Sequence, residues 1–167
     1  MKPEIHKTSY VDKTAVILGE VNIGKNCGIF PNSVIRGDQN TIEIGDGSNI
    51  QDCCVLHVNT EYKIVIGKNV SIGHGAIVHG ATIEDDCLIG INSTILDGAI
   101  IKKGSVIGAN ALVTAKMIVP ENSLVIGIPG KVVKKNKVYR ERAFDNAQEY
   151  QRLTKEHKEG KHLRKKI

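Results

Sequence analysis

Aromatic residues are scarce in this chain of 167 residues: they make up 4% of it, and tryptophan is absent. Its core must therefore be built from isoleucine, valine, leucine and alanine, which is unusual in globular domains but normal in repeat proteins with a thin interior. The sequence also has no apolar run long enough to span a bilayer and no signal-peptide pattern at its start. We therefore expect a cytoplasmic protein that binds no membrane.

Disulfide and zinc-finger patterns are absent as well. The four cysteines, Cys27, Cys53, Cys54 and Cys87, show no CxxC or Cys/His spacing, and a reducing compartment keeps such residues as thiols. Residues 131–167 contain 13 Lys/Arg and 5 Asp/Glu, a net charge of +8, whereas the preceding residues carry −3. No aromatic residues alternate with the charges of the tail KEGKHLRKKI, so it offers no stacking platform. We expect a solvated helix face and no nucleic-acid binding.

An aliphatic residue recurs at every sixth position through most of the chain. A period of six fits neither a helix nor a simple alternating strand, but it is typical of the hexapeptide repeats of a parallel β-helix. Three extra residues precede Ile44, four precede Ile66, and the step to Ile83 is one residue short. The series is Val11, Ile17, Ile23, Ile29, Ile35; Ile44, Ile50, Leu56; Ile66, Ile72, Val78; Ile83, Ile89, Ile95, Ile101, Ile107, Val113, Val119 and Val125.

These nineteen repeats resemble those of left-handed hexapeptide β-helix proteins over residues 11–130. With three repeats to a triangular coil, they predict an all-β fold of about six coils. We therefore assign residues 1–130 to a left-handed β-helix domain. Residues 131–167 are assigned to a C-terminal helix, at about 137–158, and a basic tail that packs on the β-helix. Cys27, Cys54 and Cys87 recur at inward positions, where we expect small core residues.

Counting repeats places two histidines above one another. Ile35, Leu56 and Val78 are three repeats apart, so they lie in one column, and the residues that follow them are Arg36, His57 and His79. The two imidazoles should project in the same direction from adjacent coils, about 4.8 Å apart. They are then close enough to share a metal ion.

A third histidine belongs to a different column. His74 comes two positions after Ile72, beside Asp52, which has the same place after Ile50. A turn separates this column from that of His57, so one chain should not bring the three imidazoles to one ion. In a homotrimer, His57 and His79 of one subunit can face His74 of the next, giving three ligands and an open position, as in zinc enzymes.

Three segments carry a more specific resemblance: IRGDQN (35–40), IQDCCVLH (50–57) and IGHGAIVHGATI (72–83) are similar to the motifs of the γ-class carbonic anhydrases. The resemblance implies a left-handed β-helix trimer that holds zinc, or iron or cobalt, on three histidines at each subunit interface. It also implies reversible hydration of carbon dioxide to bicarbonate by a metal-bound hydroxide. The metal ligands it implies are His57, His74 and His79.

The same resemblance suggests roles for four further residues. Arg36 and Asp38 would pair across the interface and help to hold bicarbonate. Gln51 would orient the metal-bound hydroxide or the substrate, and Asp52 would anchor Arg36 or a histidine.

Proton transfer is where the chain departs from the family pattern. Some members have a glutamate directly after the RGD segment and an acidic loop, whereas here Gln39 follows Asp38 and the insertion NTEYK (59–63) supplies only Glu61. Glu61 is a candidate proton shuttle, although a charged loop tip is the plainer interpretation. Tyr150 of the helix is a second candidate, with a packing role as its alternative.

Two other classes of function fit the repeat pattern. A hexapeptide acyltransferase that uses acetyl-CoA shares the fold and often ends in a segment like GIPGKVVK, but it needs one histidine as general base and no stacked pair. A non-catalytic assembly protein would keep the metal for trimer stability, and removing the metal should then dissociate it. The missing glutamates favour this second alternative, whereas Arg36 and Gln51 argue against it.

Overall fold

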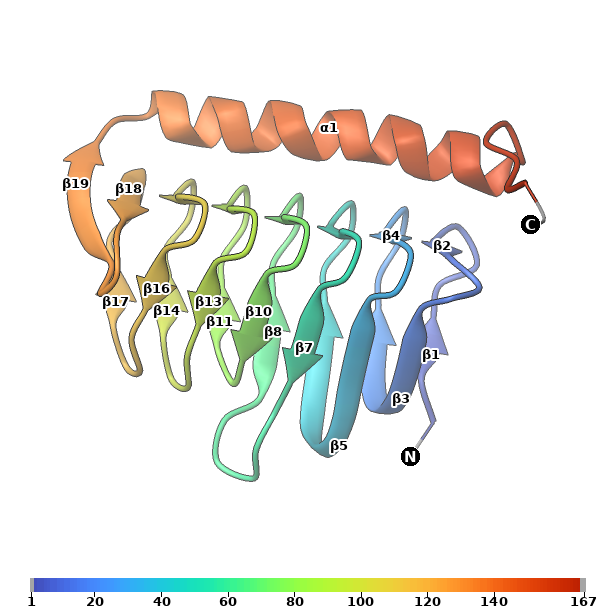
Figure 1. Cartoon of the computed structure of the whole chain (residues 1–167), viewed down its shortest axis with the longest axis horizontal. Coiled ribbons are helices and arrows are strands. Elements are labelled where there is room, and N and C mark those ends of the chain that lie inside the picture. Colours follow the sequence, from blue (N-terminus) through green and yellow to red (C-terminus); the bar gives the residue numbers. More distant parts are fainter. Residues whose placement is uncertain (1, 166–167) are drawn as a thin grey trace.

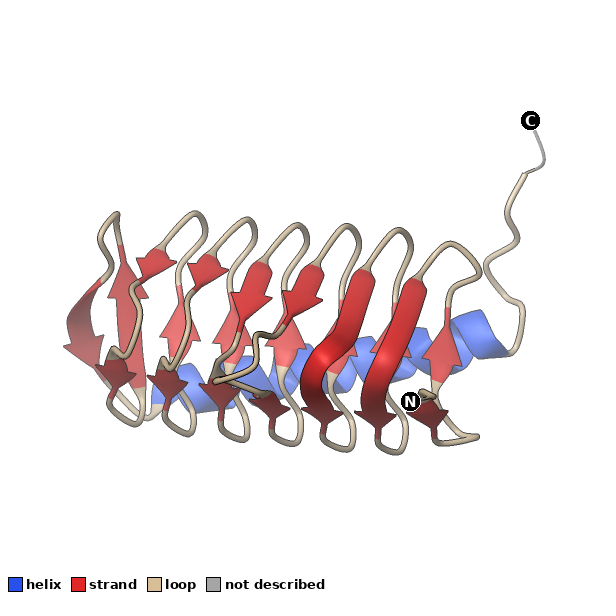
Figure 2. Ribbon diagram, turned by 90° about the horizontal axis from the view of Figure 1, so that it is seen from below, coloured by secondary structure: helices blue, strands red, loops and turns tan. Residues whose placement is uncertain are grey.

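The computed structural model describes residues 2–165, which form a left-handed parallel β-helix with one long helix along its side (Figure 1). The chain winds around three faces of a prism, and each strand pairs with the strand one coil away (Figure 2). Partial coils at both ends bring the total to about seven turns, against about six predicted. The repeats therefore predicted the fold class correctly.

Each face is a column of short strands. The first face carries β2 (Tyr10–Val11), β4 (Gly28–Ile29), β6 (Asn49–Ile50), β9 (Ser71–Ile72), β12 (Leu88–Ile89), β15 (Val106–Ile107) and β18 (Ser123–Ile126). The second carries the first halves of β3 (Val16–Ile23) and β5 (Val34–Ile44), then β7 (Val55–His57), β10 (Ile77–His79), β13 (Thr94–Ile95) and β16 (Leu112–Val113). The third carries β1 (Glu4–Ile5), the second halves of β3 and β5, β8 (Ile64–Ile66), β11 (Thr82–Ile83), β14 (Ile100–Ile101) and β17 (Ile118–Val119).

The aliphatic residues that recur every six positions form the core, because each points inward from one strand of the prism. Every buried isoleucine removes its side chain from water, which stabilises the fold by about 1.5–3 kcal/mol. Three buried columns result: Ile29, Ile50, Ile72, Ile89, Ile107 and Val125; Ile35, Leu56, Val78, Ile95 and Val113; and Ile23, Ile44, Ile66, Ile83, Ile101 and Val119.

Small side chains fill the inward positions next to the corners. Cys27, Cys54 and Cys87 are buried free thiols, as predicted, and only Cys53 is exposed. Burial raises the pKa of the Cys54 thiol to about 12. Its Sγ lies 3.0 Å from the carbonyl oxygen of Gly73 on the next coil, so the thiol is part of the packed interior.

Asparagine makes many of the corners, because it tolerates the left-handed backbone conformation that a tight turn needs. Six asparagines adopt φ between 53° and 59°: Asn26, Asn32, Asn69, Asn92, Asn110 and Asn122. Their backbone groups also join the coils. The amide of Asn92, for example, donates to the carbonyl of His74 one coil away, over 2.9 Å.

The two insertions widen the prism locally without breaking its register. The first is absorbed in β5, which runs through a corner and pairs with both β7 and β8. The second forms the loop before β8, where Nδ2 of Asn40 donates to the carbonyl of Asn59 over 3.2 Å. The short step before Ile83 is a tight corner at Gly80, whose φ is +54°.

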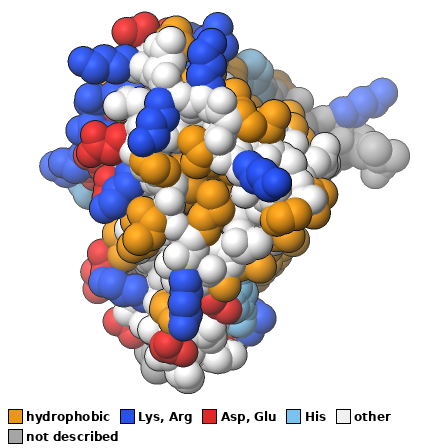
Figure 3. All heavy atoms as spheres, turned by 90° about the vertical axis from the view of Figure 1, so that its left-hand side faces the viewer, with side chains coloured by type: hydrophobic (Ala, Val, Ile, Leu, Met, Phe, Trp, Pro, Cys, Tyr) orange, Lys and Arg blue, Asp and Glu red, His pale blue; other side chains and the backbone are white. Residues whose placement is uncertain are grey.

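The C-terminal part crosses back over the β-helix. Sequence analysis assigned no element to 131–135, but Lys131–Lys135 form β19, which pairs antiparallel with β18. The helix α1 (Val138–Lys158) then runs along the first face, in contact with β2, β4, β6, β9 and β15 (Figure 1). Hydrophobic side chains lie exposed on the end of the molecule that carries β19 (Figure 3). Ile128, just before β19, and Val133 within it are both exposed. No helix among residues 2–165 is long and apolar enough to cross a membrane.

Candidate metal centre

His57 and His79 end two neighbouring strands of the second face. Parallel pairing of β7 and β10 sets the two residues directly opposite each other, in the register predicted by the count of repeats. Their rings are 5.0 Å apart, and Nδ1 of His57 lies 3.0 Å from Nε2 of His79. Both side chains are mostly buried, at 15% and 30% exposure. The scaffold therefore brings two imidazole nitrogens face to face.

Arg36 and Asp38 lie on the coil below, at the first half of β5. Arg36 is the direct strand partner of His57, as predicted. Its Nη1 donates to Oδ2 of Asp38 over 2.7 Å, and Oδ1 of Asp38 lies 3.2 Å from Nε2 of His57. The hydrogen bond from Arg36 holds the pKa of the Asp38 carboxyl below its usual range. The two residues pair here within one chain, so the predicted pairing across an interface requires this exposed ion pair to exchange partners.

Asp97, on the coil above, was missed by sequence analysis. It follows β13, and its Oδ1 lies 2.6 Å from Nδ1 of His79. The available signal was its place two residues after Ile95, directly above the His79 corner. The count of repeats indicates the coil of a residue but not the direction of a side chain at a corner, so it does not predict the contact of Asp97 with His79.

His74 lies at the turn after β9, beside the helix. Its Nδ1 is 2.9 Å from Oδ2 of Asp52, the neighbour expected from the count of repeats. Its backbone N–H donates to Oε1 of Gln51 over 3.2 Å, and Nε2 of Gln51 donates to Oδ1 of Asn49 over 3.0 Å. Gln51 is buried, at 3% exposure. Both ends of its amide are thus engaged within the chain, where they hold the turn that carries His74.

Tyr150 reaches His74 from α1. Its hydroxyl lies 3.2 Å from Nε2 of His74, and its ring packs edge-on against Phe30 with the centroids 5.5 Å apart. Burial, followed by the negative charge of Asp52, raises the pKa of Tyr150, so the residue stays a phenol and can donate. Tyr150 thus both packs against Phe30 and contacts His74. Glu61, in contrast, lies exposed in the loop before β8, where its backbone N–H donates to Oδ1 of Asn59.

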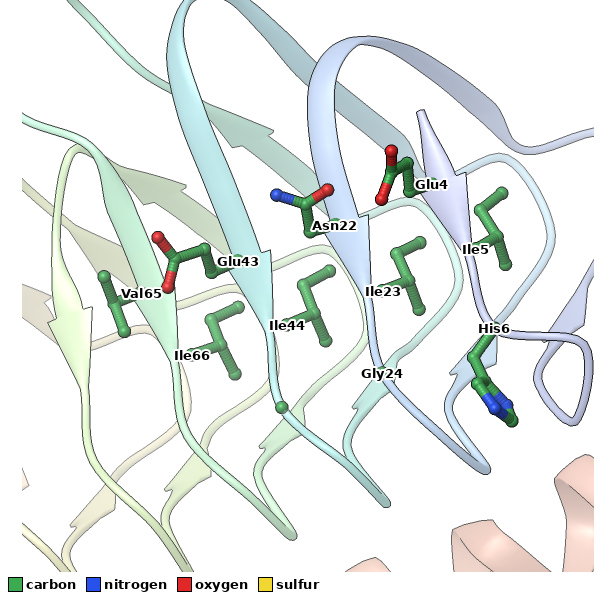
Figure 4. Close-up of a pocket in the computed structure, with 11 residues that line it drawn as sticks. Glu4, Ile5, His6, Asn22, Ile23, Gly24, Glu43, Ile44, Val65 and Ile66 are labelled. Carbon is green, nitrogen blue, oxygen red and sulfur yellow. The ribbon is translucent and has the colours of Figure 1, made fainter. Parts of the chain in front are cut away.

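The histidines form two separate clusters in one chain. Within residues 2–165, no group of three or more His, Cys, Asp or Glu side chains is placed to hold a metal ion. The His57–His79 pair lies on the second face, whereas His74 lies at the turn after β9. The hollow drawn in Figure 4 lies elsewhere, over β1, β3, β5 and β8, and none of the predicted site residues lines it.

The donor set nevertheless suits a divalent metal ion. Two imidazole nitrogens on one tetrahedral zinc ion stand about 3.3 Å apart, given zinc–nitrogen bonds of about 2.0–2.1 Å. The facing nitrogens of His57 and His79 are 3.0 Å apart. His74 and His79 each have a carboxylate at Nδ1, which is the usual outer partner of a metal-binding histidine. The residues present therefore fit a divalent metal ion.

Comparison with known proteins finds relatives described as carbonic anhydrases. The chain is 55% identical over 130 residues to a "Probable carbonic anhydrase" of Methanocaldococcus jannaschii, covering 78% of this chain and 82% of the relative. It is 38% identical over 139 residues to "Gamma carbonic anhydrase 2, mitochondrial" of Arabidopsis thaliana, covering 80% of this chain and half of that protein. "Carnitine operon protein CaiE" of Escherichia coli K12 is 36% identical over 132 residues, with coverage of 79% and 67%.

The fold is also shared with proteins described as hexapeptide transferases. The family described as "Bacterial transferase hexapeptide (six repeats)" matches residues 80–115. The crystal structure of a hexapeptide transferase family protein from Anaplasma phagocytophilum superimposes with a TM-score of 0.87 at 35% identity, over 91% of this chain and 90% of that one. With the identities and coverage of the carbonic anhydrase relatives, these matches show that the chain belongs to the γ-class carbonic anhydrase family of hexapeptide-repeat proteins.

Proposed function

We propose that the protein is a metal-dependent enzyme that catalyses the reversible hydration of carbon dioxide to bicarbonate. The observation that carries this proposal is the pair of stacked imidazoles, His57 and His79, whose facing nitrogens are 3.0 Å apart. An acyltransferase needs a single histidine as general base, so it gives no reason for a second imidazole on the next coil. Membership of the γ-class family supports the same choice of reaction.

The site is completed by assembly into a homotrimer, with His57 and His79 from one subunit and His74 from the next. An exposed apolar stripe next to the histidine column supports such a partner. Val55 and Ile77 point outward two residues before His57 and His79 and are 37% and 42% exposed. The stripe continues through Val34 to Val16, which is 46% exposed. Closed threefold symmetry would bury this stripe three times and create three equivalent sites.

Zinc suits three imidazole ligands, and iron(II) or cobalt(II) suit them as well. When bound, such an ion lowers the pKa of water to near neutrality and so supplies a nucleophile at physiological pH. The chain's own residues then have defined tasks. Arg36 offers a cation to the bicarbonate anion, and Asp38 holds the Arg36 guanidinium in place at 2.7 Å. Asp52 and Gln51 fix the ring and the backbone of His74.

A proton must also leave the site for solvent. The Tyr150 hydroxyl is the candidate carrier closest to a ligand, at 3.2 Å from Nε2 of His74. Glu61 is exposed in its loop, where its backbone N–H donates to Oδ1 of Asn59, so its side chain depends on movement of the loop to serve the site. Of the two proton-shuttle candidates, the structure therefore favours Tyr150.

Stopped-flow hydration of carbon dioxide tests the proposal directly. The protein is loaded with zinc, and separately with ferrous iron under anaerobic conditions, and each form is compared with His74→Ala. Activity in either form that disappears in the variant would support a metal-dependent hydratase. If trimers that hold one metal ion per subunit show no activity, the assignment is wrong, and a metal-binding assembly protein becomes the better description.

Binding of acetyl-CoA tests the acyltransferase alternative. The structure of a protein described as a "putative acetyltransferase" of Bacillus cereus resembles this chain with a TM-score of 0.80 at 36% identity. Binding of acetyl-CoA to the metal-loaded trimer can be measured by calorimetry. Saturable binding that survives His57→Ala would favour this alternative, and absence of binding would exclude it.

A further inference from the structure

The shortest contact made by any of the three proposed ligands joins His79 to Asp97. Oδ1 of Asp97 lies 2.6 Å from Nδ1 of His79, compared with 2.9 Å between Asp52 and His74 and 3.2 Å between Asp38 and His57. A carboxylate only accepts hydrogen bonds when ionised. The contact therefore requires a proton on Nδ1 of His79, which leaves the lone pair on Nε2.

That lone pair points at the other histidine. Nε2 of His79 is the nitrogen that faces Nδ1 of His57 at 3.0 Å. A row of three contacts thus runs from Asp97 through both rings to Asp38. Two neutral imidazoles supply only two N–H donors for these three contacts. The shortest contact, between Asp97 and His79, is the one most strongly stabilised by an N–H donor. Asp97 therefore determines which nitrogen of His79 is free.

The backbone beside His79 is shaped to admit the carboxylate. A Cβ at Gly80 would lie 2.4 Å from Oδ1 of Asp97 and 2.7 Å from Cβ of Tyr62. Gly80 also has a φ of +54°, a left-handed conformation that glycine adopts without strain and that most other side chains, asparagine apart, disfavour. The residue directly after the proposed ligand thus leaves room for Asp97 on one side and for the Tyr62 side chain on the other.

We propose that Asp97 is a positioning residue that fixes the Nδ1–H tautomer of His79 and so presents its Nε2 to the metal ion, and that Gly80 provides the space for it. This inference rests on the proposed function, because it assumes that His79 is a ligand. Asp97 touches neither substrate nor metal in this account and acts only through His79. Outer partners of this kind contribute about 10- to 100-fold to metal affinity.

Two measurements on Asp97→Ala test the inference. The first is the zinc affinity of the full-length trimer, measured by competition with a chelator. The second is the tautomer of His79 in metal-free protein, read from two-bond nitrogen–proton NMR spectra of ¹⁵N-histidine-labelled protein and assigned with His79→Gln. Asp97→Asn keeps an acceptor oxygen without the charge. Glu121→Ala removes an exposed carboxylate on a distant turn and serves as the matched control.

We expect Asp97→Ala to bind zinc about 10- to 100-fold more weakly than wild type, to lose the dominance of the Nδ1–H form, and to remain trimeric. Asp97→Asn should lie between the two, and Glu121→Ala should match wild type. An unchanged tautomer, or an altered tautomer with unchanged zinc affinity, would overturn the inference. If the wild type itself binds no zinc, the proposed function fails, whereas the tautomer in the metal-free protein still reports separately on the link between Asp97 and His79.

Discussion

The hydroxyl of Tyr150 and Nε2 of His74 lie 3.2 Å apart, although the residues are 76 positions apart in the chain. The other ring nitrogen of His74, Nδ1, lies 2.9 Å from Oδ2 of Asp52. The nitrogen that remains for a metal ion is thus the one that the tyrosine contacts. In the proposed site, metal loading must therefore replace this hydrogen bond, and the helix that covers the first face influences the proposed third ligand.

Tyr150→Phe should consequently tighten metal binding. The variant keeps the ring against Phe30 but removes the hydroxyl that competes for Nε2 of His74. Such a hydrogen bond contributes about 0.5–1.5 kcal/mol net, so its removal should raise the metal affinity by about 2- to 10-fold. Chelator competition on the assembled protein measures the change, with Tyr139→Phe on the same helix as control. Weaker binding by Tyr150→Phe would show instead that the hydroxyl supports the occupied site.

Mixed trimers test whether the sites are shared between chains. His57→Ala and His74→Ala each remove one ligand from every site of their own trimers. After dissociation and reassembly of a 1:1 mixture, about one quarter of the sites should receive His57 and His79 from one variant and His74 from the other. Metal content and hydration activity should recover to that level.

A second mixture provides the control for shared sites. His57→Ala and His79→Ala remove ligands that come from the same chain, so no mixture of them restores an intact set. Native mass spectrometry confirms that mixed trimers have formed. Lack of recovery in mixed trimers of the first pair would contradict a site built from two subunits.

The core columns predict large stability losses at single positions. Ile72 is fully buried between Ile50 and Ile89, so Ile72→Ala should lower the free energy of unfolding by about 2–5 kcal/mol. Ile118→Ala removes the same atoms from an outward position that is 60% exposed, and it should change stability by at most about 0.5 kcal/mol. Urea denaturation at one fixed protein concentration compares them. Equal losses would contradict the inward and outward assignment.

The cysteines should differ sharply in reactivity. Burial raises the pKa of Cys27 to about 11 and that of Cys54 and Cys87 to about 12. These thiols therefore hold little thiolate at pH 8, and reaction requires the thiolate. A disulfide reagent should label one thiol per native chain, the exposed Cys53, and four after unfolding. Cys53→Ser should show no native labelling; rapid labelling of that variant would reveal an open interior.

Much of this architecture follows from the spacing of aliphatic residues. A period of six determines which residues share a column, and it predicted the opposition of His57 and His79 and the neighbourhood of His74 and Asp52. It even extends to Ile5, six residues before Val11, where the structure has the additional strand β1. These features depend only on local repeats and on the constant rise between coils.

Other features depend on contacts that no repeat encodes. The position of α1 along the first face decides whether Tyr150 meets His74, and a single helix without repeats leaves that position open. The strand β19 was not predicted, because Pro129 and Gly130 end the hexapeptide pattern without indicating that the chain turns back to pair with β18. Asp97 reaches His79 only because of the space at the Gly80 corner.

Asp38, His57, His79 and Asp97 belong to four successive coils, joined by strand pairing throughout. Their mutual distances are thus set by the pitch of the solenoid, about 4.8 Å for each coil, and by nothing beyond those four layers. A duplication of whole coils at either end would lengthen the molecule and leave this row intact. Insertion of one coil between β7 and β10 would separate the two imidazoles by a further layer. This row therefore tolerates added coils at the ends of the solenoid but no added coil between its own layers.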